Sequence, residues 1–158
     1  MANSVSYAAF LLGLCVEACA QTIEITPTTV QRGSANVFRI VLKTHPERPI
    51  VALQWNLVYQ DGLRIELSGI VSGSASEAAG KSTACTLKPS KGTNHLLSCI
   101  VAGGVKPFPA GAIALVRFEA TKNTPKGEMT VILEKIVGVS PSLESVPIPV
   151  TKAAIAIR

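Results

Sequence analysis

From Gln21 onward, almost every segment of the chain alternates apolar and polar residues as β-strands do, and turn residues separate the segments. No stretch keeps the apolar periodicity of a helix. The sequence also contains no internal repeat of the length found in repeat proteins. The segments expected to be strands are 22–26, 35–43, 51–59, 63–71, 82–88, 94–101, 112–121, 128–139 and 150–157. Residues 72–81, rich in Ser, Ala and Gly, are expected to form a loop or one helical turn. This pattern predicts an all-β fold of about nine strands, a β-sandwich or jelly roll.

The composition limits the function classes that the chain can belong to. A chain of 158 residues with 47% hydrophobic residues has the length of a single domain and can bury a core without a metal or a partner. Asp61 is the only aspartate, so calcium loops and paired-aspartate catalytic sites are nearly excluded. The basic residues are scattered singly without interleaved aromatics, which argues against a nucleic-acid groove.

The pattern of residues 1–20 is typical of a secretory signal peptide. An apolar stretch over 7–16 is too short to span a bilayer, which needs roughly 20 residues, and Ala18-Cys19-Ala20 supplies the small residues for cleavage before Gln21. We therefore expect a mature domain over 21–158, secreted, extracellular or in the cell envelope. Two alternatives remain: Cys19 as the lipidated cysteine of a degenerate lipobox, which would tether the protein to a membrane, or a buried N-terminal helix.

The expected mature chain keeps two cysteines, Cys85 and Cys99, and an even count in an exported chain suggests a disulfide. Both cysteines lie seven residues from Gly92, in two strand-like runs that flank a turn, so a hairpin there places them opposite each other. The alternative of two free thiols or half a metal site lacks further ligands, because the only histidines are His45 and His95. We expect no metal and no cofactor.

Five aromatic residues follow Gln21, and they bear on sugar binding. Trp55 has Leu53 and Leu57 at the neighbouring positions of its face, so it is expected in the core. Phe38, Tyr59 and Phe118 also occupy strand positions whose periodicity suggests the core. Phe108, between two prolines, is the one good candidate for an exposed ring.

Four motifs resemble those of cohesin domains. The alternating strand 51–59, which ends in Tyr59 and is followed by Gln60-Asp61-Gly62-Leu63, looks like the third strand and turn of that family. Val101-Ala102-Gly103-Gly104 and the strand 111–120 are similar to its small-Gly-Gly loop and its G-x-L-A-x-I-x-F strand. Pro147-Ile148-Pro149-Val150 before the last strand also fits. The motifs occur in the family's order over residues 22–157.

The resemblance implies a nine-stranded jelly-roll β-sandwich of cohesin type, related in fold to cellulose-binding carbohydrate-binding modules. It also implies a non-catalytic module that attaches to a dockerin-like or other extracellular protein, with a link to polysaccharide degradation and polysaccharide as a further partner. Cohesins of cellulosomes hold dockerins on the outer face of the sheet formed by the third, fifth, sixth and eighth strands. On this chain that face would present the partner-binding candidates Gln54, Asn56, Thr86, Leu96, Ser98 and Ile100.

The residues of that face support the expectation independently. A plain solvent face should be polar, yet Ala52, Val58, Leu96 and Ile100 are apolar. Exposed mixed patches of this kind usually mark a partner surface. Two alternatives stay open: a strand phase shifted by one residue, or coverage of the face by residues 72–81.

Three other functions compete with protein binding. An enzyme lacks support, because neither histidine has a nucleophile or carboxylate at an informative spacing; a glycosidase would need two glutamates to meet among Glu66, Glu77, Glu119, Glu128 and Glu134. A direct carbohydrate-binding module would need exposed, coplanar aromatics. A structural sandwich domain of a secretion or pilus apparatus is the third alternative.

Overall fold

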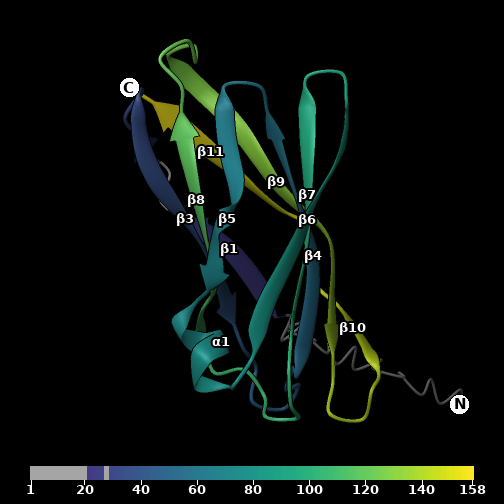
Figure 1. Cartoon of the computed structure of the whole chain (residues 1–158). Helices are drawn as coiled ribbons and strands as arrows, with labels where there is room; N and C mark the ends of the chain where they lie inside the picture. Colours follow the sequence, from purple (N-terminus) through teal and green to yellow (C-terminus); the bar gives the residue numbers. More distant parts are fainter. Residues whose placement is uncertain (1–20, 27–28) are drawn as a thin grey trace, which may run out of the picture.

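The computed structural model describes residues 21–26 and 29–158 of the chain (Figure 1). The expected signal peptide, including Cys19, lies outside the described residues. The strands are β1 (Thr22–Thr26), β2 (Thr29–Val30), β3 (Ser34–Lys43), β4 (Ala52–Gln60), β5 (Leu63–Ser72), β6 (Ser82–Lys91), β7 (Asn94–Ala102), β8 (Gly111–Ala120), β9 (Gly127–Val139), β10 (Ser145–Pro147) and β11 (Thr151–Ile157). A single helical turn, α1 (Ser74–Ala78), follows β5. In the described part of the chain, no helix is long and apolar enough to span a membrane.

The strands form two sheets that pack face to face as a sandwich (Figure 1). The four-stranded sheet has the order β1-β3-β8-β5, and the seven-stranded sheet has the order β2-β11-β9-β4-β7-β6, with β10 also paired to β9. The all-β sandwich expected from the sequence is confirmed, and each of the nine expected segments forms a strand. The structure adds β2 and β10, which are two and three residues long.

The core between the sheets is built from the alternating residues of the strands. On β4, Leu53, Trp55, Leu57 and Tyr59 all point inward and are buried, as the period of two predicts. Trp55 is therefore a core residue, as expected. In the opposite sheet the Phe38 and Phe118 rings stack with their centroids 3.7 Å apart.

Helix α1 closes one end of the sandwich, at the end opposite to the β6–β7 turn (Figure 1). The Ser76 hydroxyl is fully buried and donates a hydrogen bond of 2.6 Å to the Ile113 carbonyl of β8. Gly73, which begins this turn, lies so close to β8 that a Cβ atom there would be 2.3 Å from the Ala112 carbonyl oxygen. The segment thus packs against β8 and the end of β6, away from the centre of the seven-stranded sheet.

The expectation for Phe108 is wrong, because the ring is buried in the core. The Phe108 amide donates a hydrogen bond of 2.9 Å to the Ile50 carbonyl, which holds the segment between the two prolines against the sandwich. The Lys81 Nζ lies 5.1 Å from the ring centroid, within the range of a cation–π contact. All five aromatic residues from Gln21 onward are therefore buried.

Lys81 itself is a buried cation. Its Nζ donates hydrogen bonds of 2.7 and 3.3 Å to the carbonyls of Gly103 and Gly104, so it fixes the glycine loop that follows β7. Burial lowers the pKa of Lys81 below its usual value, because the charged form loses water.

Candidate partner-binding face

The candidate site is the outer face of β9, β4, β7 and β6, which are consecutive strands of the seven-stranded sheet. These are the strands that the sequence resemblance selects. We call this surface the outer face; it is formed by the residues of these strands that alternate with the core residues.

The strand register brings the six candidate residues together on this face. Gln54 of β4 lies opposite Ile100 of β7, and Asn56 lies opposite Ser98. Thr86 of β6 is in turn opposite Ser98. Leu96 pairs with Val58 in the next row. The candidates therefore occupy three neighbouring rows, and the predicted strand phase is confirmed.

The exposure of these side chains is graded across the face. Ile100 is 46% exposed, and Gln54 and Thr86 are also exposed, whereas Leu96 and Ser98 are half-buried. Asn56 is only 7% exposed, because its short side chain lies on a central strand with neighbours on both sides. Asn56 thus belongs to the floor of the face and offers little surface to a partner.

A shallow depression lies where β4, β7 and β6 meet. It is lined by Gln54, Ala84, Thr86, Lys88, Ser98, Cys99 and Ile100. Four of the six sequence-predicted candidates line it, and no residue of α1 does. The alternative in which residues 72–81 cover this face therefore does not hold.

A bulge in β9, which the strand pattern of the sequence did not predict, alters the edge of the outer face. Gln54 pairs with Val137, but Asn56 pairs with Glu134, so β9 has one residue more than β4 over this stretch. The extra residue bends the strand at Lys135, which adopts a φ of 49° and is exposed. The sequence does carry a sign of the bulge, since the spacing of core residues changes from two to three between Leu133 and Ile136.

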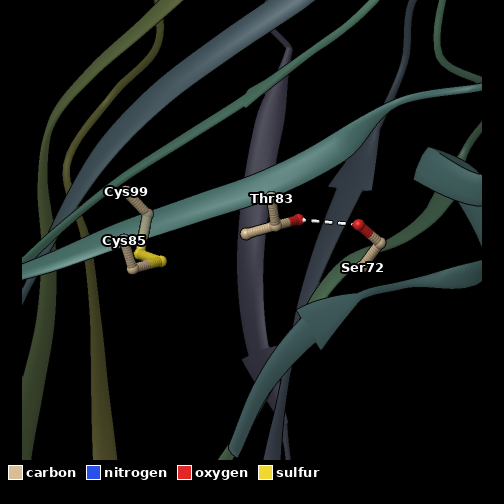
Figure 2. Close-up of a disulfide and its surroundings, with 4 residues drawn as sticks. All are labelled: Ser72, Thr83, Cys85 and Cys99. Atoms are coloured by element: carbon tan, nitrogen blue, oxygen red, sulfur yellow. Dashed lines mark hydrogen bonds between the residues drawn. A yellow bond between two sulfur atoms is a disulfide. The ribbon is translucent and has the colours of Figure 1, made fainter. Parts of the chain in front are cut away.

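The disulfide between Cys85 and Cys99 is confirmed (Figure 2). The two residues are directly opposite each other on β6 and β7, with their Cα atoms 4.1 Å apart. Their side chains point to the inner side, where Cys99 is fully buried. In the described sheets β6 is the outermost strand of the face and pairs only with β7, so the disulfide adds a covalent link between β6 and the rest of the sheet.

A second contact holds β6 against the opposite sheet. The hydroxyl of Thr83, two residues before Cys85, shares a hydrogen bond of 3.1 Å with the Ser72 hydroxyl of β5 (Figure 2). Together with the disulfide, this bond fixes β6 both to its neighbour and across the sandwich. A rigid strand at this position keeps the shape of the depression.

Charged residues of both signs lie around the face. Lys88 lies at the β6 end of the depression, and Glu134 and Lys135 lie side by side at the bulge in β9. The two histidines are elsewhere: His95 Nε2 is 2.6 Å from Asp61 Oδ1 near the β6–β7 turn, and its ring stacks on Tyr59. Among the described residues, no group of three or more His, Cys, Asp or Glu side chains could hold a metal ion.

Comparison with solved structures identifies the fold class. The non-cellulosomal cohesin from Archaeoglobus fulgidus superposes with a TM-score of 0.66 at 15% identity, covering 88% of this chain and 91% of that one. The cohesin–dockerin complex Coh-OlpA–Doc918 from Clostridium thermocellum matches with a TM-score of 0.74 at 12% identity, over 88% and 99%. A cohesin module from a family 33 glycoside hydrolase of Clostridium perfringens matches with a TM-score of 0.63 at 13% identity, over 88% and 96%.

The chain therefore has the fold of cohesin modules. No protein-family model matches its sequence, and no curated protein matches it significantly. At identities of 12–15%, the likeness is one of fold.

Proposed function

We propose that this protein is a non-catalytic, secreted or cell-surface binding module that attaches to a dockerin-like or other extracellular protein through its outer face. The observation that carries the proposal is the composition of that face: exposed Ile100 and half-buried Leu96 lie among the polar residues Gln54, Thr86 and Ser98, on strands that a disulfide holds together. Interfaces between proteins combine apolar residues with polar groups. Binding would use surface complementarity and no cofactor.

Two further observations support this proposal. Several solved structures with this fold are complexes of a cohesin with a dockerin, including the Clostridium thermocellum complex. The Cys85–Cys99 disulfide fits an oxidising environment outside the cytoplasm, where such bonds persist. We also propose a link to polysaccharide degradation, for which the fold is the only support.

Direct sugar binding receives no support from the aromatic residues. Flat polysaccharides are gripped by exposed rings, and all five aromatics after Gln21 are buried, Phe108 included. Protein binding is therefore the function that the outer face supports best.

The test is a capture experiment with the mature protein as bait for the secreted and envelope fractions of its source organism. The variant Leu96→Lys/Ile100→Lys places two charges on the outer face, where an apolar contact with a partner would be lost. A matched control, Val37→Lys/Val71→Lys, makes the same change at exposed positions of β3 and β5 in the opposite sheet.

The captured protein is then purified and its affinity for the bait is measured directly. We expect the outer-face variant to weaken binding by more than about tenfold, which corresponds to about 1.4 kcal/mol, and the control to leave it unchanged. Equal loss in both variants would move the site away from the outer face. Retention of the bait on insoluble polysaccharide, with no protein captured, would refute protein binding.

A further inference from the structure

The sandwich is open along the side where β5 and β6 face each other, because each is an edge strand of its sheet among the described residues. At one end of this side the Ser72 and Thr83 hydroxyls share a hydrogen bond and close the gap (Figure 2). Nearer the β6–β7 turn a groove of about 410 Å³ lies between the two strands. We call it the edge groove, and its large apolar lining residues are Tyr59, Leu63, Ile65 and Leu87.

Leu87 shows that the core is incompletely covered at the edge groove. Its side chain lies on the inner side of β6, because it shares a face with Cys85 and is opposite the fully buried Leu97 of β7. Residues on the inner side of a sandwich are normally covered by the opposite sheet, yet Leu87 is 42% exposed. Leu87 therefore offers an apolar contact to a chain that enters the groove.

The hydrogen bonds of β7 determine which way its backbone groups point. At the turn end of the β4–β7 ladder the Asp61 amide donates a hydrogen bond of 2.9 Å to the Thr93 carbonyl. Hydrogen-bonded pairs occur at every second position of an antiparallel ladder, and steps of two from Asp61 lead to Trp55 and its partner Cys99. Cys99 therefore directs its backbone N–H and C=O toward β4 and away from β6.

It follows that β6 directs unpaired backbone groups into the open side. Cys85 lies opposite Cys99, so its own N–H and C=O point away from β7, and the Cα separation of 4.1 Å is typical of such a pair. Thr83 and Leu87, two positions before and after Cys85, share this orientation. An edge strand with a row of free donors and acceptors is a template for a further strand.

The charged residues in the lining of the edge groove are all basic. They are Arg64, Lys88 and His95. Arg64 contacts Glu66 and His95 contacts Asp61, whereas the described residues give Lys88 no ion pair. Complementary charge across an interface favours the matching partner over others, so the groove selects acidic side chains.

We propose that the edge groove binds an extended segment of a partner protein, in which apolar and acidic residues alternate, as an additional strand on β6. Side chains of a strand point alternately to its two faces. The apolar ones would pack on Leu87 at the inner side, and the acidic ones would lie beside Lys88 at the outer side. Main-chain hydrogen bonds to β6 would supply the affinity. A second copy of β6 is a poorer occupant, because that strand contains lysines and no acidic residue.

The test uses octapeptides in which Glu alternates with Val, Leu or Phe, added to the isotope-labelled oxidised protein and followed by NMR of the backbone amides. We expect the amides of Thr83, Cys85 and Leu87 to shift and to gain protection from hydrogen exchange. Peptides with Lys in place of Glu should bind at least about tenfold more weakly. Acidic peptides that are N-methylated at every second residue, and so lack the donors of a strand, should not bind.

The variant Leu87→Asp places a carboxylate in the edge groove and should weaken binding of the acidic peptides at least about tenfold. The matched control is Ser82→Asp, which adds the same charge to the outer side of the same strand and should leave the affinity within about twofold. Because the N-methylated peptides test the wild type, the proposal stays falsifiable even if Leu87→Asp does not fold.

Four results would overturn the proposal: no binding of the acidic peptides at millimolar concentration, equal binding of the lysine or N-methylated peptides, shifts confined to the outer face, or self-association through β6. The last would assign the edge to a second copy of the chain. The edge groove goes beyond the proposed function and does not depend on it, although Lys88 lies beside both sites. Failure here would leave the capture experiment on the outer face untouched.

Discussion

Removal of the Cys85–Cys99 disulfide should cost the protein about 3 kcal/mol of its free energy of unfolding. The two cysteines are 14 positions apart, and a closed loop of this size restricts the unfolded chain by about that amount in the chain-entropy account. For a domain of this size the loss corresponds to a fall in Tm of about 10 °C. The perturbation is the double variant Cys85→Ala/Cys99→Ala, since alanine leaves no buried hydroxyl without a partner.

The assay is urea unfolding of the wild type and the variant, each with and without a reductant. Reduction of the wild type isolates the cross-link, and the difference between reduced wild type and variant measures the truncation of buried Cys99, about 1 kcal/mol. Reductant should leave the variant unchanged. Since β6 pairs only with β7 in the described sheets, hydrogen exchange in the reduced wild type should accelerate first in β6.

The result that would refute this reasoning is a reduced wild type that unfolds within about 0.5 kcal/mol of the oxidised protein. Such a result would mean that the hairpin is already formed in the unfolded ensemble, so that the bond restricts nothing further. Accelerated exchange spread evenly over both sheets would likewise contradict the local role of the bond.

Further predictions concern two backbone positions and two buried ionisable groups. Leu143→Gly should raise the free energy of unfolding by about 1 kcal/mol, because Leu143 has a φ of 65° and an 82% exposed side chain; Val105→Gly, 85% exposed without a positive φ, should give no such gain in the same thermal melts. Gly73→Ala should lower the free energy of unfolding by at least about 2 kcal/mol, because the new methyl group would meet the backbone of β8. An unchanged midpoint of urea unfolding would contradict the observed packing. Burial lowers the pKa of Lys81, so the unfolded state binds this proton more tightly than the folded state does. The stability of the wild type relative to Lys81→Met should therefore rise as the pH increases to 10.5. Burial raises the pKa of Tyr59 above 10.0, so the stability of the wild type relative to Tyr59→Phe should fall above pH 10. Melting curves across this range check both signs.

The sequence predicts those features that depend on local pattern. Trp55 could be placed in the core because Leu53 and Leu57 share its face in a strict period of two. The disulfide could be placed because a hairpin turn at Gly92 sets Cys85 and Cys99 opposite each other, and no distant element is needed. The same local alternation gave the strand phase that brings Gln54, Thr86 and Ile100 onto one surface.

The features that it missed arise from contacts between distant segments. Phe108 lies outside any periodic strand, and the Ile50 carbonyl and Lys81, both far away in sequence, hold it in the core. Strand β2 is only two residues long and exists because it pairs with the end of β11. The burial of Asn56 depends on its central place in a sheet whose strand order no local pattern reveals.

The bulge in β9 depends both on the local sequence and on the pairing of distant strands. A single added residue turns Lys135 into a left-handed conformation and shifts the remainder of the strand by one position, so that Ile136 and not Lys135 reaches the core. A bulky residue in this conformation costs about 1–2 kcal/mol, and bulges of this kind re-aim side chains beside functional surfaces. Lys135 lies at the edge of the outer face, where the proposed partner would meet it. If the strain serves binding, Lys135→Gly should stabilise the free protein and weaken its complex with the captured partner. If the stability rises and the affinity is unchanged, the bulge has no part in recognition and the partner lies nearer to β6.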